Sequence, residues 1–120
     1  MPLIAIIDWA ASPLDDSDAA VERAVIGDAA RVKRFLCSSD ADFDEEICDA
    51  DALIVWHNTP ITATGLNRLR NCKTLIRNGV GFDSVDIDAA RQLGIPVCNV
   101  PNYGTEEVAD HAIALTLALC

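Results

Sequence analysis

Short apolar runs alternate with segments of helical pattern along most of the chain. The first run, Leu3 to Ile7, is continuously apolar, as expected for a parallel strand that is covered on both faces. Comparable runs predict four more strands, at Val32 to Cys37, Ala52 to Trp56, Thr74 to Arg77 and Pro96 to Asn99.

Between these runs, capping residues and glycines mark helices. We expect helices near Asp18 to Gly27, from Asp42 to Ile47, from Pro60 and Thr62 to about Arg70, and from Val85 to Leu93. Gly27 and Gly94 stand where two of these helices should end. The alternation of strands and helices predicts an α/β fold, a flavodoxin-like parallel sheet with flanking helices.

The last segment has a different pattern. Gly104 and Thr105 begin a helix that carries Glu106 and Glu107 in its first turn, where the helix dipole favours acids. Residues 108–119 are nearly all apolar, and a helix that is apolar around most of its circumference must be buried on several sides. We therefore expect it to pack against a second domain or subunit. An isolated chain should be unstable or self-associate through residues 105–120.

Composition limits the classes of partner. The 120 residues suit one modest domain or a piece of a larger one, with 51% hydrophobic and 23% charged residues. The net charge of −10 argues against nucleic acid and anionic membrane surfaces. Five scattered cysteines without a C-x-x-C pair favour reduced, buried thiols over disulfides or zinc. With no signal-like start and no run of transmembrane length, we expect a cytoplasmic protein.

Candidate chemistry gathers in residues 77–86, Arg-Asn-Gly-Val-Gly-Phe-Asp-Ser-Val-Asp. A strand leads into Gly79 and Gly81, and an amphipathic segment follows, a join that should expose backbone N–H groups at a helix N-terminus to an anion. A dinucleotide-binding loop is one interpretation of the two glycines. Ser84 then stands where glycine or alanine is expected, and the next strand ends at Asn99 instead of an acid. A plain tight turn is the other interpretation.

This block and the two that follow it, Gly94 to Pro101 and Gly104 to Ala112, resemble the D-isomer-specific 2-hydroxyacid dehydrogenases. The likeness is to the branch of C-terminal binding protein and phosphoglycerate dehydrogenase, and it is specific over residues 73–119. It implies that residues 1–101 form a substrate-binding domain. Residues 102–120 would be the interdomain helix that starts a nucleotide-binding Rossmann domain.

The resemblance also implies roles for four residues. The N–H groups of Val80 and Gly81 would hold the substrate carboxylate, Val80 would lie against the nicotinamide of NAD, and Val108 would touch the cofactor. Arg77 would make a second carboxylate contact, since its planar fork suits that group. From the residues alone, Arg77 also fits a surface charge and Val108 also fits core packing.

The two histidines form no metal site, because no carboxylate cluster accompanies them. His111 suits a packed or capped position more than a catalytic one. His57 follows the third strand at the edge where ligands gather in such sheets, and it could line a cleft. The family's catalytic arginine, glutamate and histidine belong to the second half of its polypeptides. We therefore name no catalytic residue here.

The resemblance implies hydride transfer between NAD(H) and a 2-hydroxy or 2-keto acid, in a homodimer when intact. An alternative is a non-catalytic, repressor-like or scaffold module that binds protein partners on the same fold, with a hydrophobic peptide groove in its first half. A receiver-like domain is disfavoured, because Trp56 and His57 stand where that class needs an acceptor aspartate. Two departures from the family are Asn78, in the substrate region, and Gly65, which should weaken its helix.

Overall fold

The computed structural model describes residues 1–9, 19–56 and 59–120. Five strands form one parallel sheet in the order β2-β1-β3-β4-β5. They are β1 (Leu3–Asp8), β2 (Arg31–Leu36), β3 (Ala52–Val55), β4 (Leu75–Arg77) and β5 (Val97–Cys98). This order is that of flavodoxin-like sheets, so the predicted fold is confirmed.

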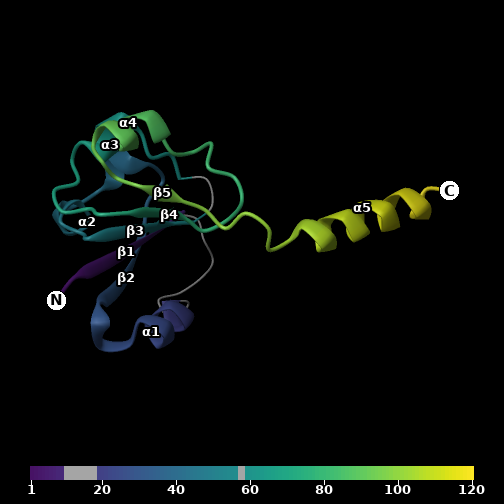
Figure 1. Ribbon diagram of the computed structural model, residues 1–120, viewed down its shortest axis with the longest axis horizontal. Helices are drawn as coiled ribbons and strands as arrows, with labels where there is room; N and C mark the ends of the chain where they lie inside the picture. Colours follow the sequence, from purple (N-terminus) through teal and green to yellow (C-terminus); the bar gives the residue numbers. More distant parts are fainter. Residues whose placement is uncertain (10–18, 57–58) are drawn as a thin grey trace.

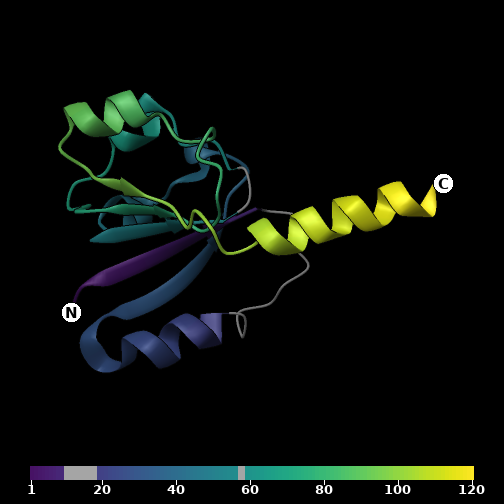
Figure 2. The same cartoon turned by 45° about the vertical axis from the view of Figure 1, so that its right-hand side comes forward.

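Helices lie on both faces of the sheet (Figure 1). Within the described residues they are α1 (Ala20–Ile26), α2 (Glu45–Cys48), α3 (Ala63–Leu66), α4 (Ile87–Gln92) and α5 (Thr105–Ala118). Helices α2, α3 and α4 cover one face, and α1 lies against the other (Figure 2). Gly27 and Gly94 have φ values of 56° and 71° and end α1 and α4, as predicted.

The main core lies between the sheet and the α2–α4 layer. Ala5, Ile7, Leu53, Val55 and Leu75 project from neighbouring strands into this layer and are fully buried. A smaller cluster under α1 is built on Ile6, Ala19 and Val32. Both faces of the central strands are therefore apolar, which is why these strands appear in the sequence as continuous runs.

Helix α3 is much shorter than the predicted segment, which ran to about Arg70. After Leu66 the backbone hydrogen bonds change to the tighter 3-10 pattern, in which an N–H donates to the carbonyl three residues earlier. The Arg70 N–H donates to the carbonyl of Cys48 at 2.8 Å. That distant partner pulls the chain toward α2 and ends the helix. Helix α2 also differs from the prediction, because Asp40–Asp42 form a separate 3-10 turn before it and Asp44 caps its N-terminus.

Helix α4 begins at Ile87, two residues later than predicted. Val85 forms a parallel β-bridge with Ile61, in which Ile61 N–H donates to Ser84 O at 2.8 Å and Asp86 N–H donates to Ile61 O at 2.9 Å. These contacts hold Val85 in extended backbone, so the helix starts only after Asp86. The Asp86 carboxylate then caps it by accepting from Ala89 N–H at 2.9 Å.

A polar junction joins the 3-10 turn to α3. One carboxylate oxygen of Asp40 accepts from the Thr62 N–H at 2.7 Å, the Thr62 hydroxyl at 2.6 Å and the Gly65 N–H at 3.1 Å. A Cβ atom at Gly65 would lie 2.4 Å from that carboxylate. Gly65 is therefore required by the close approach of Asp40, in addition to its expected weakening of the helix.

Helix α5 leaves the sheet and extends away from it at the end of a connecting segment (Figure 1). It buries none of its 14 residues, and Val108, Ile113, Leu115 and Leu117 are all more than half exposed. The helix thus has the apolar surface that the sequence indicated and no cover for it within the described chain.

Candidate functional site

The loop after β4 lies at the carboxyl edge of the sheet, where open parallel sheets bind ligands. Residues 78–86 run from the end of β4 to the cap of α4. Val80, Gly81 and Phe82 are exposed, whereas Gly79 is buried at the base of the loop. Of the candidate residues, Val80 and Gly81 therefore lie on an accessible loop.

Two peptide groups of this loop are held by the segment that follows β5. The Val100 N–H donates to Gly79 O at 3.0 Å, and the Asn99 side-chain amide donates to Val80 O at 2.8 Å. The described part of the chain contains no cis peptide. Since C=O and N–H of a trans peptide point in opposite directions, the N–H groups of Val80 and Gly81 both point away from Asn99 and Val100.

These two N–H groups have no hydrogen-bond acceptor within the described residues. Adjacent N–H groups that point the same way form a concavity suited to an anion, such as one carboxylate. The two parallel N–H groups belong to the loop and not to a helix, because α4 starts only at Ile87. The expectation that these donors lie at a helix N-terminus is therefore wrong, and the helix dipole has no part in the arrangement.

Arg77, at the end of β4, turns back over its own loop. Its Nη1 donates to Asn78 O at 2.7 Å, and a Cβ atom at Gly79 would lie 2.3 Å from the same nitrogen. Its Nε is buried without a hydrogen-bond partner among the described residues. The side chain is half-buried over Gly79, which differs from a freely solvated surface charge. Its predicted contact with a carboxylate stays a prediction.

The other predicted positions lie on α5 or outside the described residues. Val108 is 69% exposed, and His111 is exposed as well, so neither packs in a core within this part of the chain. Both lie on the uncovered helix, so the cofactor contact and the core packing weighed for Val108 both stay predictions. His57 falls outside the described residues.

A buried ion pair joins Asp8, at the carboxyl end of β1, to Arg34, within β2. Arg34 donates to Asp8 Oδ2 through Nε at 3.0 Å and through Nη2 at 2.7 Å, and both side chains are at most 5% exposed. Removing one member of such a pair would leave an uncompensated buried charge. Asp8 is thus engaged with Arg34, which agrees with the argument against a receiver-like acidic site.

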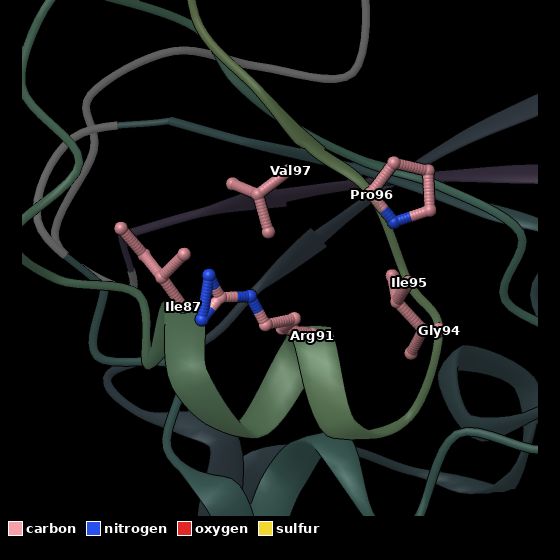
Figure 3. A pocket seen from close by; sticks show the side chains of 6 residues that line it. All are labelled: Ile87, Arg91, Gly94, Ile95, Pro96 and Val97. Atoms are coloured by element: carbon pink, nitrogen blue, oxygen red, sulfur yellow. The ribbon is translucent and has the colours of Figure 1, made fainter.

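A separate pocket of about 380 Å³ lies between α4 and the edge strand β5 (Figure 3). Ile87, Ile95, Pro96 and Val97 give it mainly apolar walls, and Arg91 turns its guanidinium toward Ile87. In the part of the chain that the structure describes, no group of three or more His, Cys, Asp or Glu side chains converges to hold a metal ion.

All five cysteines are free thiols, but they are not all buried. Cys37 and Cys48 lie in the core, whereas Cys98 is exposed on the edge strand β5 and Cys120 is exposed beyond α5. Burial, helped by the nearby carboxylates of Asp42 and Asp44, raises the pKa of Cys37 to about 11. Among the described helices, none is long and apolar enough to cross a bilayer.

Open parallel sheets bind ligands at their carboxyl edge, and the free N–H pair of the β4 loop lies at that edge. Residues 10–118 match the family model of the D-isomer specific 2-hydroxyacid dehydrogenase catalytic domain. The chain belongs to this family. The predicted resemblance is therefore confirmed.

Two curated relatives illustrate the match. The chain is 32% identical over 119 residues to C-terminal-binding protein 1 of Caenorhabditis elegans, which is 98% of this chain and 15% of that protein. It is 42% identical over 73 residues to D-3-phosphoglycerate dehydrogenase of Archaeoglobus fulgidus, 61% of this chain and 14% of the relative. The chain thus spans about one-seventh of the length of these curated relatives.

Solved structures agree on the fold. D-lactate dehydrogenase from Aquifex aeolicus, complexed with NAD and lactic acid, superposes with a TM-score of 0.77 at 24% identity, over 97% of this chain and 33% of that one. An NADPH-dependent glyoxylate/hydroxypyruvate reductase from Sinorhizobium meliloti, in complex with NADP and malonate, gives 0.71 at 28% identity. It covers 97% of this chain and 33% of the reductase.

Sequence reasoning missed one residue of the loop's support, Asn99. The residue entered only as the end of the fifth strand, where it argued against a dinucleotide site. An amide side chain directly after a strand, at the edge where ligands bind, was the available signal. Its bond to Val80 depends on the adjacency of β4 and β5.

Proposed function

We propose that this chain forms part of an NAD-dependent oxidoreductase that transfers hydride between NAD(H) and a D-2-hydroxy or 2-keto acid. The chain would supply one wall of the substrate cleft, with residues 1–101 as substrate-binding domain and residues 102–120 as interdomain helix. The single observation that carries the proposal is the pair of free N–H groups at Val80 and Gly81. In this family, a substrate carboxylate is the natural acceptor for them.

The loop offers complementary chemistry to such a substrate. A carboxylate oxygen bound by preorganised N–H donors gains charge-assisted hydrogen bonds without moving the loop. The Val80 side chain, 49% exposed beside these donors, provides an apolar surface against which a nicotinamide ring can lie. NADH would supply the hydride that reduces a 2-keto acid, and NAD would accept it from a 2-hydroxy acid. Arg77 would add positive charge next to the carboxylate, an important contribution in a chain with net charge −10.

Two solved relatives support this choice of ligands. The Aquifex aeolicus enzyme is complexed with NAD and lactic acid, and the Sinorhizobium meliloti enzyme with NADP and malonate. Each therefore binds a nicotinamide dinucleotide together with a carboxylic acid. We assign Val108 to the cofactor side of the cleft and α5 to an interface with a second domain, and we expect a cytoplasmic homodimer for the intact enzyme.

The first experiment is to sequence the source gene past the codon for Cys120 and express the whole encoded protein. We expect oxidation of NADH with one or more 2-keto acids. Gly81→Pro removes one N–H donor and should raise KM for the keto acid about tenfold to a hundredfold, as expected for a lost bond to a charged group. Gly81→Ala is the matched control, because a Cβ there meets nothing closer than 3.8 Å and the N–H remains.

Equal KM values for the two variants would contradict the carboxylate site. Failure of the whole protein to oxidise NADH with any 2-keto acid would favour the second candidate, a protein-binding module. That candidate is favoured by the similarity to a C-terminal-binding protein over 98% of this chain. Its predicted hydrophobic peptide groove in the first half of the chain stays a prediction, which peptide-array binding can test.

A further inference from the structure

We infer that Asn99 is a positioning residue that, together with the Val100 N–H, sets the direction of the anion-binding N–H groups of the β4 loop. The inference rests on the proposed function, because the anion is the substrate carboxylate. Asn99 does not touch the substrate in this scheme. It acts through the peptide group that joins Val80 to Gly81, by a bond of 2.8 Å to the carbonyl of that group.

Two glycines give the backbone of this loop its conformational freedom. Gly79 and Gly81 flank Val80, and glycine gives the backbone access to more conformations than any other residue. A peptide group between such positions can rotate as a unit, which would exchange the directions of its C=O and N–H. If the Val80–Gly81 peptide rotated in this way, a carbonyl oxygen would face the carboxylate where an N–H donor is needed. Like partial charges would then replace a hydrogen bond.

Two donors oppose this rotation from the same side. Val100 N–H fixes the carbonyl of Gly79, and the Asn99 amide fixes the carbonyl of Val80. The first bond holds the plane that carries the Val80 N–H, and the second holds the plane that carries the Gly81 N–H. The first donor belongs to the main chain and survives substitution by any residue except proline. The second depends entirely on the side chain at position 99.

Asparagine suits this task for a chemical reason. A carbonyl oxygen can only accept, so position 99 must supply a donor, and the amide NH₂ does this without adding charge. Aspartate has the same shape but offers only acceptor oxygens when ionised. It would repel the Val80 carbonyl and add a negative charge near the anion. Substitution by aspartate therefore tests the donor with little change in volume.

The test uses the whole encoded protein, labelled with ¹⁵N, and D-lactate as the titrant. In wild type, the amide signals of Val80 and Gly81 should move as D-lactate is added. Asn99→Ala should weaken D-lactate binding about three- to tenfold, as expected for the net effect of one hydrogen bond, and Asn99→Asp at least as much. The Gly81 amide shift should change in both variants before any ligand is added, since it belongs to the peptide group that Asn99 holds.

Asn102→Asp is the matched control for charge, because Asn102 is exposed three residues further on and makes no hydrogen bond within the described chain. It should leave the Gly81 shift and D-lactate affinity nearly unchanged. If Gly81→Pro abolishes binding while Asn99→Ala and Asn99→Asp bind like wild type, the positioning role is wrong and the carboxylate site stands. If Gly81→Pro binds D-lactate like wild type, the carboxylate site itself is wrong, and the positioning inference fails with it.

Discussion

Substitution of Gly65 by alanine sets two physical effects of opposite sign against each other. Alanine is the better helix former, and in an exposed helix the exchange would stabilise the chain by about 1 kcal/mol. Gly65 lies in the short helix α3, however, and an added Cβ would stand 2.4 Å from the Asp40 side chain. No pair of non-bonded carbon atoms tolerates that separation, so the Asp40 carboxylate or the backbone must move.

The size of the loss in unfolding free energy follows from the hydrogen bonds that the Asp40 carboxylate accepts. Its Oδ2 accepts three hydrogen bonds, from Thr62 N–H, Thr62 Oγ1 and Gly65 N–H. Overpacking costs about 1–3 kcal/mol, and loss of one bond to a carboxylate costs about 1.5–3 kcal/mol. These two costs outweigh the gain in helix propensity. We therefore expect Gly65→Ala to lower the free energy of unfolding by about 2–4 kcal/mol.

Equilibrium unfolding in urea, followed by far-UV circular dichroism and tryptophan fluorescence, measures this free energy. With a urea dependence of about 2 kcal/mol per M, the midpoint should fall by roughly 1–2 M. Gly81→Ala is the control, because its Cβ has room, and it should unfold at nearly the wild-type midpoint.

A double-mutant cycle isolates the contact. Asp40→Gly removes all three atoms nearest to the new Cβ. The cost of Gly65→Ala measured in the Asp40→Gly background should therefore be smaller than in wild type by at least about 1.5 kcal/mol. A Gly65→Ala chain as stable as wild type would refute the steric reasoning. An unchanged cost in the Asp40→Gly background would show that the strain arises elsewhere.

Two further predictions concern the thiols and the last helix. Cys37 has its pKa raised to about 11, first by burial and then by two neighbouring carboxylates, so alkylation of the native chain at pH 8 should modify Cys98 and spare Cys37. In the unfolded chain the Cys37 thiol ionises near pH 9. Its contribution to the free energy of unfolding is therefore present below pH 9 and is lost as the pH rises to about 11. A Cys37→Ala chain whose urea midpoint falls as steeply as that of wild type over this pH range would contradict the linkage. Leu117→Glu should reduce self-association in light scattering, whereas Val21→Glu, on α1, should not; equal effects would show that α5 is not the contact.

The strands were predictable because parallel strands covered on both faces are runs of apolar residues. Local pattern and composition suffice to find them, and all five strands lie within one residue of their expected bounds. Helix ends were less predictable, because they depend on partners far away in the sequence. Helix α3 stops where Arg70 bonds to Cys48, and α4 starts late because Val85 pairs with Ile61. No periodicity within either segment contains that information.

The candidate site likewise has features that local sequence predicts and features that depend on contacts between distant segments. The exposed loop that carries Val80 and Gly81 could be predicted from the glycine pattern, whereas the carboxylate-binding role of these residues stays a prediction. The role inferred for Asn99 could not be predicted, since it requires knowing that the segment after β5 lies beside the loop after β4. Gly65 was interpreted from its low helix propensity alone, whereas the contact with Asp40 decides its role.

The two free donors of the β4 loop belong to the main chain. Their presence does not depend on which side chain occupies position 80 or 81, provided that neither is proline. An alanine scan would therefore pass over both positions without removing a single donor atom. Under the proposed function, the side chains at 78, 80 and 82 could therefore vary to suit substrates of different size while the main-chain donors for a carboxylate persist. Residue identities compared across relatives would show such divergence of specificity but could not display the donors themselves.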